Sequence, residues 1–89
     1  MTSDLQSKCM TANGYVFQGP GRVCCIIIHS QQAGVLTMKD GGSGGTTKIE
    51  IGYGANANFP VPLNGQGVRF STDIYLSATA LDRITVFWG

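Results

Sequence analysis

Segments in which apolar and polar side chains alternate recur along this chain, and glycine, proline, asparagine or aspartate separates each segment from the next. A period of two places successive side chains on opposite faces of an extended strand, whereas helical periodicity is almost absent. The sequence therefore predicts an all-β fold, a small antiparallel β-sandwich or barrel of about seven short strands. The expected strands are residues 14–18, 22–30, 34–39, 46–53, 68–71, 73–78 and 83–89.

The length of 89 residues allows one domain with a small core. We expect residues 14–89 to form a single β-sandwich domain. Residues 1–13 show no clear period and are predicted to form an N-terminal arm or a short edge strand. The polar start lacks the apolar region of a secretory signal, and no apolar run approaches the roughly 18 residues of a membrane span. The chain thus reads as a cytosolic product without a membrane partner.

The segment VCCIII, residues 23–28, is apolar on both faces of the expected strand. We expect the domain's own second sheet to cover one face, and either another subunit or, equally, a local loop to cover the other. Alternation alone does not decide which face lies inside. The predicted core is Val16, Cys25, Ile27, Leu36, Ile49, Ile51, Val68, Phe70, Ile74, Leu76, Ile84 and Val86. The candidate subunit interface is Cys24, Ile26, Ile28 and Trp88.

The stretch KDGGSGGTTKIEIG, residues 39–52, combines glycines, hydroxyl residues and lysine, as phosphate-binding loops do. In such a loop the last glycine is followed directly by lysine and then by serine or threonine, between a strand and a helix. Here Lys48 follows two threonines, and the next residues alternate as a strand. Residues 40–45 are therefore predicted to be a flexible hairpin connection.

Residues 54–67, GANANFPVPLNGQG, are predicted to form a long connection. Pro60 and Pro62 lack the backbone N–H that a sheet ladder requires. We therefore expect this connection to cross an edge or an end of the sandwich.

No pattern of residues predicts catalysis, a cofactor or a metal site. Cys25 and His29 could make an activated thiolate only with a third orienting group, and the alternative is that His29 is a polar residue ending a strand. The carboxylates mostly flank turns, where aspartate is a turn former: Asp4, Asp40, Glu50, Asp73 and Asp82. The cysteines lack a metal-ligand spacing and cannot all pair, so we expect them to be free: Cys9, Cys24 and Cys25.

The aromatic side chains could form a stacking platform for sugars or bases if several lay on one exposed face. The alternative is packing in the sheets or anchoring of an interface, where tyrosine and tryptophan are enriched. Only 12% of the residues are charged and the net charge is +1, which argues against nucleic acid as a partner. Self-association would hide the excess apolar surface. The aromatic residues considered are Tyr15, Tyr53, Tyr75, Phe87 and Trp88.

The closing residues 62–89, PLNGQGVRFSTDIYLSATALDRITVFWG, contain a Gly-Val-x-Phe pattern formed by Gly67, Val68 and Phe70. A strand like DIYLSA and a final ITVFW follow it. A Gly-Val pair at residues 34–35, an aspartate-glycine turn in KDGGSGG and a proline-bearing loop precede it. In this order the segments resemble a loose group of small bacteriophage virion proteins, over roughly residues 14–89.

The resemblance implies a β-sandwich protein of the phage particle that is trimeric or otherwise oligomeric and has no catalytic activity. Members of such groups cement or decorate the exterior of the capsid, and others occur in tails or fibres. The shared motifs mark a fold, so they carry over only the fold-defining Gly67, Val68 and Phe70.

We therefore expect a non-enzymatic structural protein of the virion, made in the host cytoplasm. It would act as an oligomeric capsid decoration or cement protein, with a homotrimer favoured and the major capsid protein as its partner. The alternative is a tail or fibre module that binds a receptor or glycan through Tyr53, Tyr75 and residues 54–67. Neither expectation involves a cofactor.

Overall fold

The computed structural model describes residues 6–63, 67–79 and 82–89. These residues form strands in two antiparallel sheets and no helix, so the predicted all-β fold is confirmed. The five-stranded sheet has the order β1-β9-β3-β6, with β7 also paired to β3, and the four-stranded sheet has the order β2-β8-β4-β5. The strands are β1 (Gln6–Met10), β2 (Gly14–Phe17), β3 (Gly21–Ser30), β4 (Gly34–Asp40), β5 (Thr46–Tyr53), β6 (Ala57–Pro62), β7 (Val68–Phe70), β8 (Ile74–Ala78) and β9 (Arg83–Trp88).

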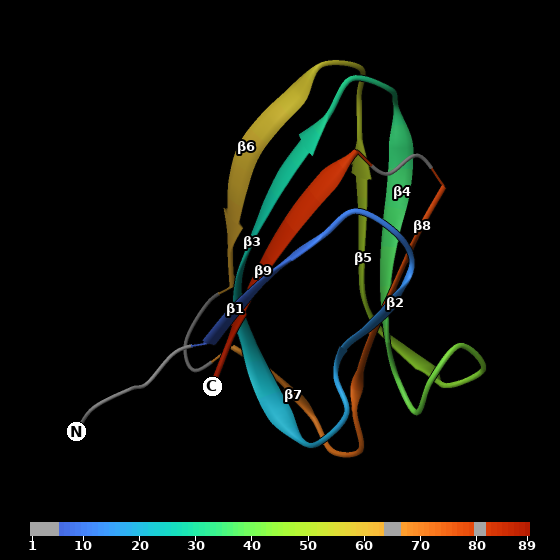
Figure 1. The fold of residues 1–89 in the computed structure, drawn as a ribbon, viewed down its shortest axis with the longest axis vertical. Coiled ribbons are helices and arrows are strands. Elements are labelled where there is room, and N and C mark those ends of the chain that lie inside the picture. The colour runs from blue at the N-terminus through green and yellow to red at the C-terminus, as the bar shows by residue number, and fades with distance from the viewer. Residues whose placement is uncertain (1–5, 64–66, 80–81) are drawn as a thin grey trace.

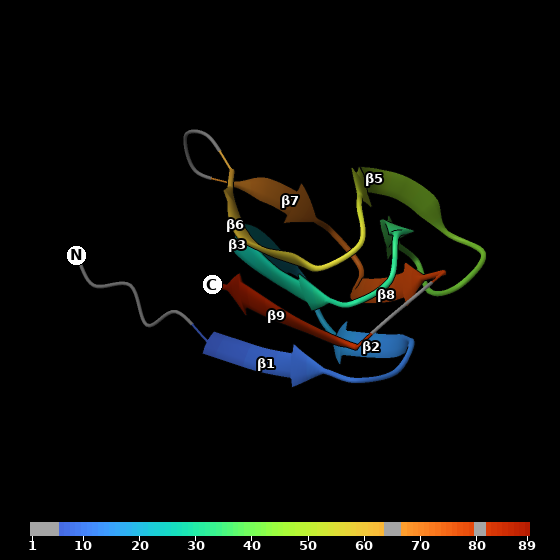
Figure 2. The same ribbon diagram turned by 90° about the horizontal axis from the view of Figure 1, so that it is seen from above.

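The two sheets lie as separate layers, which the view in Figure 2 separates most clearly. Figure 1 shows that β3 and β9 run side by side through the middle of the five-stranded sheet, in agreement with their register. The side chains of both layers that point between the sheets form one apolar core. This arrangement is the layered packing that a short chain of alternating strands requires to bury its apolar faces.

Two strands form in addition to the seven expected ones, and the first of them agrees with the edge-strand alternative given for the N-terminal residues. Residues 6–10 of the expected arm form β1, an edge strand paired to β9, whereas residues 1–5 lie outside the described residues. The second is β6, within the expected long connection, whose residues 64–66 are likewise not described. The structure thus has nine strands among its described residues, compared with about seven predicted.

β6 tolerates two prolines because it is an edge strand. The Leu63 amide donates to the Cys24 carbonyl over 3.1 Å, and hydrogen-bonded and non-hydrogen-bonded pairs alternate in an antiparallel ladder. Pro62 and Pro60, opposite Cys25 and Ile27, therefore occupy positions that need no donor toward β3.

A β-bulge in β3 decides which face of the VCCIII segment lies inside. Opposite β9, Val23 pairs with Trp88 and Cys25 with Phe87, so Cys24 is an extra residue on β3. An extra residue shifts the alternation by one position. Val23 therefore points inward, and after the bulge Ile26 and Ile28 point inward whereas Cys25 and Ile27 point outward.

This arrangement corrects the predicted core and the predicted subunit interface. Ile26 and Ile28 are both 0% exposed and Trp88 is 5% exposed, so these three side chains belong to the core of their own chain. They cannot contact another subunit in this fold, and Cys24, at the bulge, is half-buried. Cys25 and Ile27, which were expected in the core, are also only half-buried.

The remaining core predictions are confirmed or nearly so. Eight of the predicted residues are buried, namely Val16, Leu36, Ile49, Phe70, Ile74, Leu76, Ile84 and Val86. Ile51 and Val68 are half-buried and pack against this cluster. The sequence prediction omitted Met10, Val23, Ile26, Ile28, Met38, Tyr53, Ala57 and Trp88.

The glycine-rich stretch is the hairpin connection between β4 and β5, as predicted. Gly41 and Gly42 have φ of 108° and 82°, a region in which side chains other than glycine are strained. The residues that follow form β5, so the phosphate-loop interpretation lacks the helix it requires.

Candidate functional site: the outer face of the five-stranded sheet

The outer face of the five-stranded sheet carries the residues of β3 that the bulge turns away from the core. After the bulge, Cys25, Ile27 and His29 alternate with the buried Ile26 and Ile28. Cys25 and Ile27 are half-buried although β3 is flanked by β9 and β6. Figure 2 shows the second sheet on one side only of β3 and β9. The expectation that one face of this strand needs a cover from elsewhere thus applies to the face opposite to the one predicted.

Strand register places further apolar side chains beside these residues. Cys25 lies opposite Phe87 on β9 and Pro62 on β6, and Ile27 lies opposite Thr85 and Pro60. Directly opposite residues of an antiparallel pair project from the same face. We call this surface the apolar strip, defined as Cys25, Ile27, Pro60, Pro62, Thr85 and Phe87. Each of its members is half-buried or exposed in the isolated chain.

Basic side chains lie at the two ends of this outer face. His29 and Arg83 are paired at one end, and Arg22 and Arg69 at the other. None of the positions paired on this face in the described strands is an aspartate or glutamate. The apolar strip therefore has polar, basic borders and no negative charge among its paired positions.

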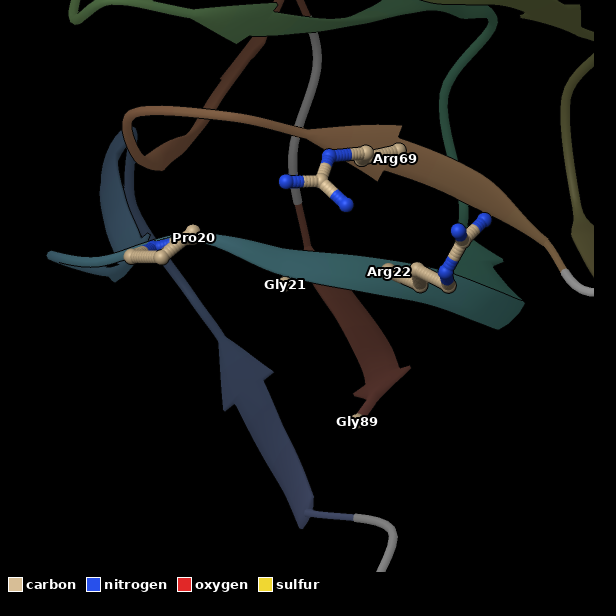
Figure 3. A pocket seen from close by; sticks show the side chains of 5 residues that line it. All are labelled: Pro20, Gly21, Arg22, Arg69 and Gly89. Atoms are coloured by element: carbon tan, nitrogen blue, oxygen red, sulfur yellow. The ribbon is translucent and has the colours of Figure 1, made fainter.

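A pocket opens at the Arg22–Arg69 end (Figure 3). Its volume is about 210 Å³, and it is lined by Pro20, Gly21, Arg22, Arg69 and Gly89. Figure 3 shows the Arg69 side chain running from β7 toward the Pro20 end of β3 and the Arg22 side chain running toward the opposite end, with both guanidinium groups on the side where β7 pairs with β3. Sequence analysis did not identify this pair, because the two arginines are far apart along the chain and become neighbours only through pairing of β3 with β7.

The outer face of the four-stranded sheet has a different character. Thr37 lies opposite Ser77 and Glu50, and Lys39 lies opposite Tyr75. Alternating polar residues of this kind suit contact with water. The exposed Tyr15 and Val35 also belong to this sheet, so its outer face is mixed, whereas the apolar strip of the five-stranded sheet consists of directly paired positions.

The aromatic residues do not form one exposed platform. Tyr53 and Trp88 are buried in the core, and Phe87 belongs to the apolar strip. Tyr15 and Tyr75 lie on the opposite sheet, with ring centroids 5.1 Å apart and planes at 86°. This edge-to-face pair leaves no row of parallel rings for stacking.

Cys25 and His29 do not form a nucleophile and base pair. They share a face of β3 but are four residues apart, which is about 13 Å along a strand at roughly 3.3 Å per residue. Ile27 lies between them. Cys9, Cys24 and Cys25 are all free thiols. In residues 6–63, 67–79 and 82–89 no three His, Cys, Asp or Glu side chains are grouped to hold a metal ion.

Folding does bring two carboxylates together, and both of them bind backbone amides. Asp40 accepts hydrogen bonds from the Ser71, Thr72 and Asp73 amides over 2.9, 2.8 and 3.3 Å, and from the Ser71 hydroxyl over 2.9 Å. The Ser71 amide, followed by the Thr72 amide, lowers the pKa of Asp40 from 3.8 to about 2. A carboxylate held ionised by three amides is a turn-binding group rather than a proton donor for catalysis.

Asp73 in turn binds the loop that follows Asp40. It accepts the Gly41 and Gly42 amides over 3.0 and 2.9 Å. We call these reciprocal contacts the Asp40–Asp73 lock, because they join the β4–β5 connection to the β7–β8 connection.

Three other polar groups lie elsewhere in the fold. Asp82 accepts the Gln31 amide over 2.7 Å, which joins the start of β9 to the β3–β4 connection. Burial, followed by the charge of Asp82, raises the pKa of Tyr53. The Trp88 indole N–H is buried without a hydrogen-bond partner among the described residues. None of these groups faces the apolar strip.

Over the part of the chain that the structure describes, no helix is long and apolar enough to cross a membrane. Comparison with protein-family models, with curated protein sequences and with solved structures gives no match, so the arrangement of residues on the outer face is the basis for assigning a function.

Proposed function

We propose that this chain is a non-enzymatic structural protein of a bacteriophage particle, an oligomeric decoration or cement protein of the capsid exterior. The observation that carries the proposal is the apolar strip, which lies in the middle of a sheet and is left open in the single chain. Apolar surface of this kind favours coverage by another protein. The resemblance of the sequence to small bacteriophage virion proteins is the reason for proposing a phage particle as the assembly in which the strip is covered.

The proposed oligomer is a homotrimer in which the strip of each subunit packs against a neighbour. Burying the strip removes apolar area from water at about 25 cal/mol per Å², and the basic borders stay solvated at the rim. The oligomer would then bind subunits of the major capsid protein. It would be made in the host cytoplasm and be carried in the virion.

Stabilisation of the capsid follows from linkage. A protein that binds the assembled lattice and not the separate subunits shifts the equilibrium toward the lattice. Several identical subunits in one oligomer bind several lattice sites together, so weak single contacts become effective. This mechanism requires no catalytic group, cofactor or metal.

The test uses phage heads prepared without this protein and then supplied with purified chain. Wild-type protein is expected to raise the temperature at which heads release DNA. Ile27→Asp is expected to lose this effect, because it places a charge in the apolar strip, whereas Ser77→Asp on the opposite sheet should retain it. Heads that resist heat and dilution equally with and without the protein would remove the cement role.

A tail or fibre module that binds a receptor or glycan is the second candidate. The observation in its favour is the Tyr15–Tyr75 pair, in which Tyr15 is 38% exposed. Tyr53 is buried and is not available for such a surface. Binding on a glycan array that Tyr75→Ala abolishes, together with detection of the protein in tails, would support this module. An array without hits and detection on heads would exclude it.

A further inference from the structure

The pocket between Arg22 and Arg69 lies at one end of the outer face and is distinct from the apolar strip. The two arginines are directly opposite each other in the antiparallel register of β3 and β7. Side chains in such positions project from one face, and like charges there destabilise a sheet. Repulsion between Arg22 and Arg69 therefore lowers the stability of the folded chain, although pairing of β3 with β7 does not require arginine at these positions.

No hydrogen bond or ion pair to a described residue offsets this cost. Neither guanidinium forms an ion pair or a hydrogen bond with a described residue. Gly89 uses its amide and carbonyl to bond the backbone of Arg22, over 2.9 and 3.0 Å. Pro20 has no N–H. The guanidinium N–H groups of the two arginines are free in the pocket, and they only donate hydrogen bonds.

We propose that this pocket binds a phosphate group. Two positive charges match an anion that carries close to two negative charges near neutral pH, whereas a carboxylate would offset only one of them. The planar guanidinium forks can each bind two phosphate oxygens. A volume of about 210 Å³ holds a phosphate with some water, since each water occupies about 30 Å³, and it is below the roughly 300 Å³ of pockets for larger ligands.

The site is independent of the proposed capsid role, because it needs one chain and no lattice. It places a ligand at the end of β3, where the charge of the ligand would also relieve the repulsion between the two arginines. Binding should therefore stabilise the folded chain, since a ligand that binds only the folded state raises the melting temperature.

The experiment titrates the full chain with inorganic phosphate at about pH 7.5, with chloride balancing the ionic strength, and follows the melting temperature and the heat of binding. Wild type is expected to show a saturable rise. Arg69→Gln should weaken binding about tenfold, which is the scale of one lost charged hydrogen bond. Arg69→Lys keeps the charge without the fork and should be intermediate. Arg83→Gln, at the other end of the same face, is the matched control and should bind as wild type does.

In chloride alone, Arg69→Gln should melt no lower than wild type, because it removes the repulsion with Arg22. This measurement separates loss of the site from loss of the fold. A wild type without a saturable response in the millimolar range, or equal responses of wild type and Arg69→Gln, would overturn the site.

A parallel titration with glycerol 3-phosphate identifies the source of the group. Equal or tighter binding of the monoester would assign the pocket to a phosphorylated molecule. Binding of inorganic phosphate with exclusion of the monoester would assign it to the free ion.

Discussion

Gly67 lies immediately before β7, one of the two strands that pair with the same edge of β3. Its φ is 84°, and a Cβ at this position would collide with the carbonyl oxygen of Val23. Glycine alone adopts this region at little cost and permits such close backbone approach. The glycine of the Gly-Val-x-Phe pattern therefore has a backbone role at the start of β7.

Gly67→Ala is expected to lower the free energy of unfolding by about 1 to 3 kcal/mol, because it adds backbone strain and a steric conflict. Urea unfolding followed by tryptophan fluorescence measures this change. Gly52→Ala is the matched control, since a Cβ at Gly52 would meet no atom within 4 Å, and it should be close to neutral. Equal stability of the two variants would contradict the role assigned to Gly67.

At the scale of elements, the Asp40–Asp73 lock joins two connections at one end of the sandwich. Asp40 ends β4 and Asp73 precedes β8, and each binds amides of the connection beside the other. Amides in connections have no ladder partner, so carboxylates that bind them satisfy donors that folding would otherwise leave open. The lock thus sets how the β4–β5 and β7–β8 connections lie relative to one another.

Stability should fall in acid as Asp40 becomes protonated. The folded-state pKa of Asp40 is lowered, so its contribution is present above 3.8 and is lost as the pH falls toward about 2. Asp40→Asn should lower the urea midpoint at pH 7, and the difference from wild type should shrink over this acidic window.

The matched control for this pH profile is Glu50→Gln. Glu50 is an exposed carboxylate on β5 that forms no hydrogen bond among the described residues. Its variant should follow the wild-type profile between pH 7 and pH 2. If Asp40→Asn tracked wild type at a constant offset at every pH, the lock would not be the source of acid sensitivity.

The two outer faces of the whole molecule differ, with the apolar strip on the five-stranded sheet and a mixture of polar and apolar side chains on the four-stranded sheet. The isolated chain leaves the apolar strip in water, and the described β1 and β6 edges flank the same sheet. Association through the strip would cover apolar area and bring neighbouring subunits near these edges, which are otherwise open to pairing with other chains. Oligomerisation is therefore the property of the whole molecule on which the proposed function depends.

Light scattering over a dilution series is expected to give the mass of a trimer for wild type and of a monomer for Ile27→Asp. Ile27 is half-buried in the single chain, so its circular dichroism and melting should remain those of a folded monomer. Ser77→Asp, on the opposite face, should remain trimeric. A wild type that stays monomeric at every concentration would show that the strip is not covered by a second copy.

The sequence by itself determined the strand content and most strand positions, because side-chain alternation and turn residues are local properties. Residues 46–53 form β5 with the predicted bounds, and the predicted connection is one residue shorter, residues 41–45, because Asp40 ends β4. Edge strands gave weaker signals: β1 has little inward face to bury, and β6 carries prolines that only its unpaired edge positions accept.

Only the tertiary structure decided which apolar face of β3 lies inside. One extra residue, Cys24, exchanges the faces of Cys25 and Ile26, and a bulge is set by the register with β9 rather than by local pattern. The same holds for the Arg22–Arg69 pocket, which requires pairing of distant strands. Periodicity specifies that a strand has two faces, whereas packing against a second sheet specifies which face is buried and which is left for a partner.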